Sequence, residues 1–388
     1  MLVKSFVILL PLVGIYFFLF HCRIDRLAPE VEKDDYFGSG SPHADNLEIL
    51  DFEINVEESK VKSFKNGWKN VEITSGIEGI KFELGMNPDY LKFLNSSKKG
   101  QQKIPLLLIH GFGGSSWDFY KILPILANPS RFGFDFGPDG KQIVFDVIVP
   151  SVPGFGLSQN PSKSGLGAIE TSRIFGKLMR RISHLKYFVH GSGELGSRIA
   201  GVLGLLDENV KGIHLGNPFL NLEEDWILKA KWNLAKIWPS GFEEIKNKNI
   251  PKMALTSFLL SRWAKGINHP EWRSHHQGGL QSHNTVDEIL TESHIYWIFG
   301  NAPHCLRFLY FTESNPSTNL FDRTTLRIPV GILTTPRTPY VLPRFFYEQK
   351  FRNIIHFVEA ESGGEFVAIE NPNLLAKEIF SFVELVLN

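Results

Sequence analysis

The segment IPLLLIHGFGGSSWDFYKILPILA, residues 104–127, decides the fold. It begins with the uninterrupted apolar run 104–109, which is typical of a strand buried on both faces of a parallel sheet. A glycine-containing turn, His110–Gly114, follows, and residues 117–127 continue at helical spacing. The segment therefore predicts a buried strand, a tight turn and a helix in direct succession.

The same alternation of strand and helix continues toward the C-terminus. Further strands are predicted at 143–150, 186–190, 211–215, 326–334 and 354–360, and helices at 168–182, 195–206 and after 371. Such alternation predicts a doubly wound, mostly parallel sheet of the α/β class. Between 217 and 325 the rhythm stops, and a Trp-, His- and Lys-rich stretch with helical patterning predicts an inserted helical cap. We therefore expect a core in two parts, 101–216 and 326–388, with the cap at 217–325.

Composition excludes several classes of function. The chain has 388 residues with 41 Lys and Arg against 41 Asp and Glu, so no basic stripe indicates a nucleic-acid partner. The two cysteines are too few for a disulfide framework or a cysteine zinc site. The histidine-rich stretch HHQGGLQSH, 275–283, is interpreted as a solvated cap loop rather than a metal cluster. We expect no metal and no cofactor.

The N-terminus carries the apolar run SFVILLPLVGIYFFLF, 5–20, with basic residues on both sides. Sixteen residues nearly span a bilayer core of roughly 30 Å, and no small-residue cleavage site follows. We predict a retained membrane anchor at 1–26, with a cleaved signal peptide of a secreted protein as the alternative. A polar linker and a short N-terminal segment are expected at 27–100.

Five motifs carry a resemblance to a known family: residues 106–126, VFDVIVPSVPGFGLSQNPSKSGLG (144–167), IYWIFGNAPHCLRF (295–308), IPVGILTTP (328–336) and GGEFVAIENPNLLAKEI (363–379). Together they resemble the microsomal-type epoxide hydrolases, including the insect juvenile hormone epoxide hydrolases. The resemblance implies an α/β-hydrolase fold with a helical cap, a lipophilic epoxide or lipid-like substrate, and attachment to the endoplasmic reticulum membrane. It leaves the oligomeric state undetermined.

The family's chemistry needs four parts. A carboxylate on the nucleophile elbow attacks the epoxide and forms an ester. A histidine, oriented by an acid, activates the water that cleaves this ester. Two cap tyrosines donate hydrogen bonds to the opening oxygen, and backbone N–H groups of an oxyanion turn stabilise the tetrahedral intermediate.

The elbow and the histidine position are both substituted in this chain. The family elbow resembles Gly-Gly-Asp-Trp-Gly-Ser, whereas this chain has HGSGELGSRI, 190–199. Alignment on the trailing Gly-Ser puts Glu194 at the nucleophile position, and alignment on the preceding strand puts Gly193 there. The family histidine aligns with Glu365, a weaker base by about two pKa units.

The remaining positions depart from the family as well. Thr338 aligns with the acid, and Phe242 aligns with one cap tyrosine. The second cap tyrosine falls on Leu309 or Tyr310, and Tyr310 is the tentative donor. The predicted oxyanion turn is His110, Gly111, Phe112 and Gly113, with Gly113 where the family has proline and His110 in a structural role.

Joint loss of these positions predicts a catalytically impaired or inactive relative that keeps a lipophilic pocket. The alternative is an active epoxide hydrolase in which Glu194 attacks and Glu365 activates water. Ser192 in Gly-Ser-Gly resembles an esterase nucleophile, but its spacing is displaced and no histidine follows in the expected segment.

Overall fold

The structure is a computed structural model that describes residues 25–29, 38, 101–137, 141–221, 285–338 and 342–388, and the single residues 14, 229 and 263. The predicted anchor and linker lie outside these residues, apart from the few just named. So do the loop 275–283, Phe242 and most of the predicted cap up to 284. Within the described part of the chain, no helix is both long and apolar enough to cross a bilayer.

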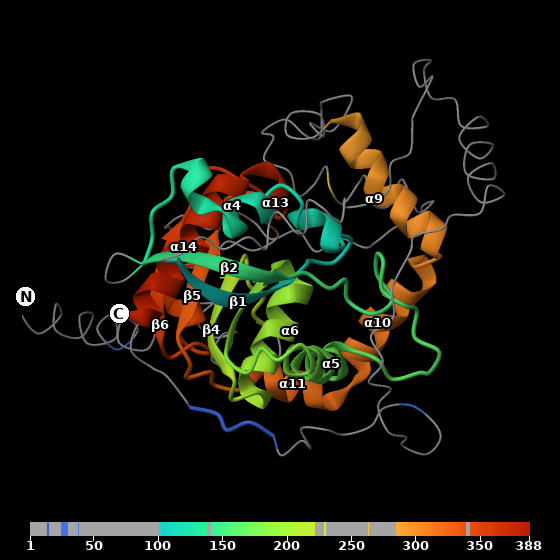
Figure 1. Ribbon diagram of the computed structural model, residues 1–388. Helices are drawn as coiled ribbons and strands as arrows, with labels where there is room; N and C mark the ends of the chain where they lie inside the picture. Colours follow the sequence, from blue (N-terminus) through green and yellow to red (C-terminus); the bar gives the residue numbers. More distant parts are fainter. Residues whose placement is uncertain are drawn as a thin grey trace, which may run out of the picture.

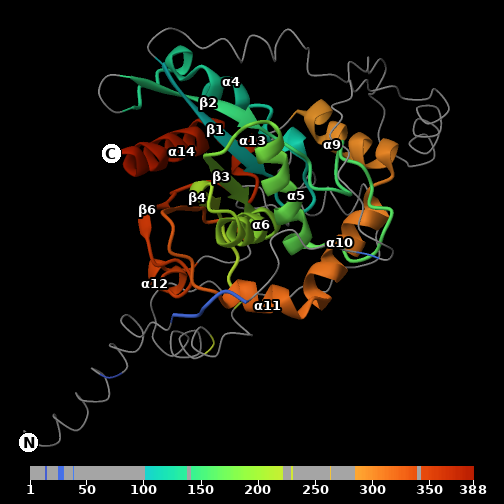
Figure 2. The ribbon, with the colours of Figure 1, turned by 60° about the horizontal axis from the view of Figure 1, so that its bottom comes forward.

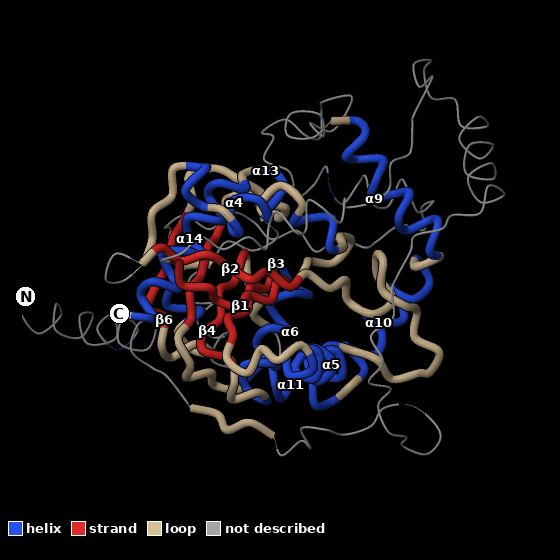
Figure 3. Tube along the Cα trace, viewed as in Figure 1, coloured by secondary structure: helices blue, strands red, loops and turns tan. Residues whose placement is uncertain are grey.

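Six parallel strands form one twisted sheet in the order β2-β1-β3-β4-β5-β6 (Figures 1 and 3). Their bounds are β1 Gln101–Ile109, β2 Gln142–Ile148, β3 Tyr187–Ser192, β4 Val210–Gly216, β5 Val330–Thr334 and β6 Ile354–Glu359. The predicted parallel α/β sheet is thus confirmed. The strand predicted from 326 begins only at Val330, after Leu326 has made an isolated bridge to Phe351.

Helices cover both faces of the sheet. The core helices and 3₁₀ turns are η1 Ser116–Phe119, α4 Leu123–Ala127, η2 Pro129–Phe132, α5 Ala168–Arg181, α6 Gly193–Leu206, α12 Arg344–Tyr347, α13 Val367–Glu370 and α14 Pro372–Leu387. In Figure 1, α4 and α14 lie on one face and α5 and α6 on the other. The predicted helix 117–127 is divided into η1 and α4, and Pro124 stands in the first turn of α4.

The two hydrophobic cores explain why residues 104–109 form an uninterrupted apolar run. Leu106 and Leu108 of β1 belong to the core beneath α4 and α14, whereas Leu107 and Ile109 belong to the core beneath α5 and α6. Side chains alternate between the faces of a strand, so a strand covered on both faces is apolar at every position.

Three helices are the described part of the predicted cap: α9 Val286–Phe299, α10 Ala302–Ser314 and α11 Pro316–Arg323. Thr285 caps α9 by accepting from the N–H of Glu288, and Asn315 caps α11 in the same way through Ser317. From α9, the chain passes α5 and returns beside α6 (Figure 2). The cap helices therefore contact the core near the start of α6.

Candidate active site

The site predicted from the sequence lies at the carboxyl edge of the sheet. The turn after β1, the elbow after β3 and the loop after β6 all leave the sheet at this edge. Strand order reverses between β1 and β3, because β2 lies on one side of β1 and β3 on the other. In open parallel sheets, such a reversal opens a crevice where ligands bind.

The elbow is the turn from β3 into α6. Gly191 and Gly196 approach so closely that a side chain on Gly191 would collide with the carbonyl of Gly196. Gly193 has φ +58°, a left-handed conformation that glycine adopts without strain. A Cβ atom at Gly193 would lie 3.2 Å from Oε1 of Glu365. The residue that faces Glu365 from the elbow is thus Gly193, which has no side chain.

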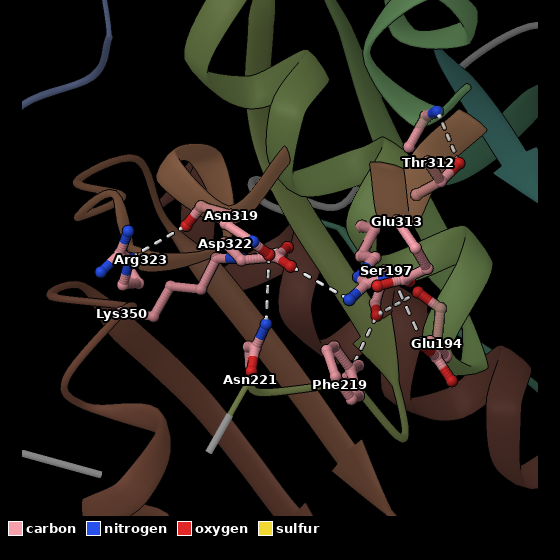
Figure 4. Close-up of polar contacts among 12 residues, drawn as sticks. Glu194, Ser197, Phe219, Asn221, Thr312, Glu313, Asn319, Asp322, Arg323 and Lys350 are labelled. Atoms are coloured by element: carbon pink, nitrogen blue, oxygen red, sulfur yellow. Dashed lines mark hydrogen bonds and ion pairs between the residues drawn. The ribbon is translucent and has the colours of Figure 1, made fainter. Parts of the chain in front are cut away.

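Glu194 takes a different direction. Its side chain is 43% exposed, and its Oε1 lies 3.5 Å from the guanidinium of Arg198, one helical turn further on (Figure 4). Arg198 is only 4% exposed and also pairs with Asp322 at 3.1 Å and with Glu313. Glu194 therefore belongs to an ion-pair network between α6 and the cap helices α10 and α11.

The central residues of this ion-pair network are buried. Lys350 approaches Asp322 at 3.8 Å, and both side chains are more than nine-tenths buried (Figure 4). Arg198 also lies 4.4 Å from the ring centroid of Phe219. A buried cation needs paired charges and hydrogen bonds to offset its desolvation. Here the charges lock the cap against the core.

Glu365 is held at the site by its loop. Thr335 donates from its hydroxyl to the carbonyl of Gly364 at 2.8 Å, and Asn217 donates to the same carbonyl at 3.3 Å. The N–H of Arg337 donates to the carbonyl of Gly363 at 3.2 Å. Glu365 is 8% exposed, so the loop presents its carboxylate to the elbow and not to solvent.

Thr338, at the predicted acid position, makes a hydrogen bond within its own loop. Its hydroxyl donates to the carbonyl of Thr335 at 3.3 Å. A hydroxyl carries no charge at neutral pH, so it cannot orient a cationic partner as a carboxylate does.

The predicted oxyanion turn is built around a neutral histidine. His110 is fully buried; its Nδ1–H donates to the carbonyl of Gly111 at 2.8 Å, and its Nε2 accepts from the N–H of Val152 at 2.9 Å. Burial lowers the pKa of His110 to about 4. Gly113 has φ +84°, a left-handed conformation that a proline cannot adopt.

Three residues of helix α9, each four positions from the next, contact the segment from Gly114 to Lys121. Glu288 pairs with Lys121 at 3.1 Å, Glu292 accepts from the hydroxyl of Ser115 at 3.0 Å, and the hydroxyl of Tyr296 donates to the carbonyl of Gly114 at 2.9 Å. These positions lie on one face of a helix. Their spacing was visible in the sequence, but their partners were not.

Two of the buried carboxyl groups face one another across this contact. Asp118 is 6% exposed and Glu292 is 1% exposed. Burial, and to a smaller extent the charge of Glu365, raises the pKa of Asp118 to about 8, although a hydrogen bond from the backbone of Ser115 opposes the rise. Burial is the larger cause, and the charge of Asp118 the smaller cause, of a raised pKa of Glu292. The pair therefore retains a proton at neutral pH.

Tyr310, the tentative cap donor, faces solvent. Its side chain is 67% exposed and makes an edge contact with Phe311 at 5.4 Å between ring centroids. The buried cap tyrosine beside the turn is Tyr296. Phe242, the other cap position, lies outside the described residues.

Apolar side chains flank the elbow region. Phe112 follows the first glycine of the turn, and Phe366 follows Glu365; both are more than nine-tenths buried. Trp263, a described cap residue, packs on Phe366 at 5.4 Å between ring centroids. The turn after β1 and the loop of Glu365 thus each contribute a buried aromatic side chain.

Comparison with known proteins agrees with this architecture. The family model described as the alpha/beta hydrolase fold matches residues 104–259. Juvenile hormone epoxide hydrolase 2 of Ctenocephalides felis is 28% identical, over 92% of this chain and 90% of that protein. Epoxide hydrolase 1 of Oryctolagus cuniculus is 25% identical over 96% of each chain.

A solved structure supports the fold independently. The juvenile hormone epoxide hydrolase of the silkworm Bombyx mori superposes with a TM-score of 0.69 at 22% identity, covering 86% of this chain and 94% of that one. The protein is therefore an α/β-hydrolase-fold chain that resembles the juvenile hormone and microsomal epoxide hydrolases along most of its length.

Proposed function

We propose that this protein is an epoxide hydrolase-like binding protein that cannot form or cleave the family's ester intermediate. The observation that carries the proposal is the pairing at the elbow: Gly193 has the left-handed conformation, and the residue facing it is Glu365. Gly193 brings no nucleophilic carboxylate to this pair, and Glu365 brings a carboxylate instead of a histidine base. Ester formation needs the first and ester hydrolysis needs the second.

The position of Glu194 argues against the competing active enzyme. In that mechanism its carboxylate would attack substrate while Glu365 activates water. Instead, the Glu194 side chain is 43% exposed, and its Oε1 lies 3.5 Å from the guanidinium of Arg198. Catalysis depends on reacting groups held within roughly 3–3.5 Å of one another, and an ångström of misplacement costs about 100-fold in rate. This geometry supports loss of the ester route.

Aromatic side chains near the site support retention of a lipophilic ligand. Phe366, next to Glu365, packs on Trp263, and Phe112 belongs to the turn after β1, at the edge of the sheet where ligands of such folds bind. The relatives named above are epoxide hydrolases, two of them of juvenile hormone, so we propose a lipophilic small molecule of similar character. We further propose that residues 1–26 anchor the protein in the endoplasmic reticulum membrane, from which such a molecule would partition.

A turnover assay tests the catalytic part of the proposal. The purified full chain in detergent is incubated with a lipophilic terminal epoxide, and diol formation is compared with that of Glu194→Gln and Glu365→Gln. We expect all three proteins to give the same background rate. Turnover by the parent protein that Glu194→Gln abolishes, with folding intact, would overturn the proposal.

Ligand retention is measured separately. Lipids that co-purify with the full chain in mild detergent are extracted and identified by mass spectrometry. Phe366→Ser should reduce the bound lipid, whereas Glu194→Gln should leave it unchanged, because Glu194 lies in the ion-pair network with Arg198. Equal lipid content in the parent protein and Phe366→Ser would refute an apolar pocket at this place.

A further inference from the structure

Ser192, the last residue of β3, stands at the head of a chain of three polar side chains. Its Oγ lies 2.9 Å from Nε2 of His190. On the other side of that ring, Nδ1 of His190 lies 2.9 Å from Nδ1 of His214. The hydroxyl, the first imidazole and the second imidazole thus form a continuous hydrogen-bonded relay.

The sheet itself produces this relay. Residues two apart on a strand share one face, which places Ser192 above His190. The parallel register of β3 and β4 pairs His190 directly with His214. Phe119 packs edge-on against the first ring at 6.0 Å between centroids, and Phe382 lies 6.0 Å from the second. Both imidazoles are therefore fixed in orientation by aromatic neighbours.

The three residues of the relay differ in how deeply they are buried. His190 and His214 are 0% and 1% exposed, whereas Ser192 is only partly buried. Ser192 is thus the least buried of the three residues in the relay. It adjoins the oxyanion turn, because a Cβ atom on Gly111 would lie 3.3 Å from the carbonyl oxygen of Ser192.

Both imidazoles are neutral at physiological pH. Burial lowers the pKa of His190 to about 3 and holds the pKa of His214 well below its ordinary value. A single hydrogen lies between the two Nδ1 atoms. When His190 carries it, the Nε2 lone pair of His190 accepts the hydrogen bond from Ser192. A nucleophile, a base and a group that orients the base then stand in line.

We propose that Ser192 is a nucleophile for carboxylic esters of lipophilic acids, with His190 as its base and His214 as a positioning residue. Oγ attacks the carbonyl carbon while its proton passes to Nε2 of His190. The carbon–oxygen bond to the alcohol then breaks, and the alcohol leaves with that proton. Water repeats the sequence and releases the acid.

The oxyanion of each tetrahedral intermediate forms beside the start of α6. The first N–H groups of a helix lack intrahelical acceptors, and the side chain of Ser192 makes no capping hydrogen bond to them. The positive end of the helix dipole favours negative charge there. The low pKa of His190 makes it a weak base, so we expect covalent labelling to be easier to detect than rapid turnover.

A covalent probe tests this proposal. The purified full chain is treated with an alkyl fluorophosphonate, which bonds its phosphorus to an activated serine oxygen and expels fluoride. Peptide mass spectrometry should locate the adduct on Ser192, and Ser192→Ala should abolish it. The matched control is Ser197→Ala, five residues further along α6, which should label as the parent protein does.

The histidines are tested through the rate of labelling. General-base catalysis contributes roughly 100- to 10,000-fold, so His190→Gln should slow labelling at least about 100-fold. His214→Leu should slow labelling, and His214→Asn, which restores a hydrogen-bonding group near the lost Nδ1, should recover part of the rate. A purely structural role would give equal rates in these two variants.

Two results would overturn the assignment: no adduct on Ser192 in the folded parent protein, or unchanged labelling in folded His190→Gln. If His190→Gln does not fold, hydrolysis of p-nitrophenyl octanoate by the parent protein and by Ser192→Ala decides instead. Equal rates in that assay would refute the role of Ser192. Epoxide turnover and co-purified lipid are separate measurements, so the outcome here stands apart from the function proposed above.

Discussion

Replacement of Asp118 by Asn should stabilise this protein at neutral pH, although it removes a buried polar contact. Asp118 and Glu292 face each other between η1 and α9, and both are more than nine-tenths buried. Asparagine has nearly the shape of aspartate and no charge. The substitution therefore removes the need to keep a proton on one of the two groups.

The magnitude follows from the shifted pKa of Asp118. Its pKa rises from 3.8 to about 8 on folding, chiefly because of burial. The folded chain therefore holds a proton that the unfolded chain releases once the pH exceeds about 4. Since stability falls with pH wherever the folded state binds more protons, the free energy of unfolding should drop by about 1.4 kcal/mol per pH unit in this window. Between pH 5 and pH 7 the loss is about 3 kcal/mol.

Urea unfolding of the full chain at pH 5, 6, 7 and 8 measures this slope. In Asp118→Asn the slope should be less negative by about 1.4 kcal/mol per pH unit. The matched control is Asp322→Asn, which also removes a buried carboxyl group but leaves Arg198 and Lys350 facing an uncharged side chain. Because it breaks a buried ion pair, this control should lose roughly 3–5 kcal/mol at pH 7.

The reasoning fails if Asp118→Asn and the parent protein show the same pH slope. It also fails if Asp118→Asn is the less stable of the two at pH 7 while the control behaves as expected. Either result would mean that the carboxyl pair ionises freely in the folded protein. The contact between α9 and η1 would then have to admit water.

Three further tests probe other parts of the architecture by urea unfolding. Glu194→Gln should alter the free energy of unfolding by less than about 1 kcal/mol, because the Glu194 side chain is half exposed. Arg198→Met should cost roughly 3–5 kcal/mol, because it leaves the buried carboxylate of Asp322 without its guanidinium partner. Similar losses in the two variants would contradict the ion-pair network. Tyr296→Phe should cost roughly 1–3 kcal/mol, since the buried carbonyl of Gly114 loses its donor, and no loss would place Tyr296 outside that contact. Thr285→Ala should cost about 1 kcal/mol through loss of the α9 cap, with Thr285→Ser as the conservative control that keeps the hydroxyl.

The elbow shows where sequence reasoning stops. Alignment on the strand and alignment on the trailing Gly-Ser gave two candidates, Gly193 and Glu194, one residue apart. Local pattern cannot choose between them, because both alignments keep a strand, a glycine and a helix. The choice depends on which residue turns left-handed and faces the loop after β6, and in the structure that residue is Gly193.

The contacts that the sequence did not predict join distant segments. Ser115 and Glu292 are 177 residues apart, and His190 and His214 are 24 apart on different strands. Each member has an ordinary sequence context: an acid on a helix, or a histidine inside an apolar strand. Only the approach of α9 to the turn and the register of β3 with β4 make them partners.

The sequence by itself determined the parallel sheet and the absence of a histidine after the final glycine pair. Strand periodicity and residue identity are local properties, so they can be read without a fold. The tertiary structure decided which distant residues meet: Glu365 with Gly193, Arg198 with Asp322, and His190 with His214. Those meetings depend on crossovers and register, in which a shift of a single residue turns a side chain to the opposite face of its strand.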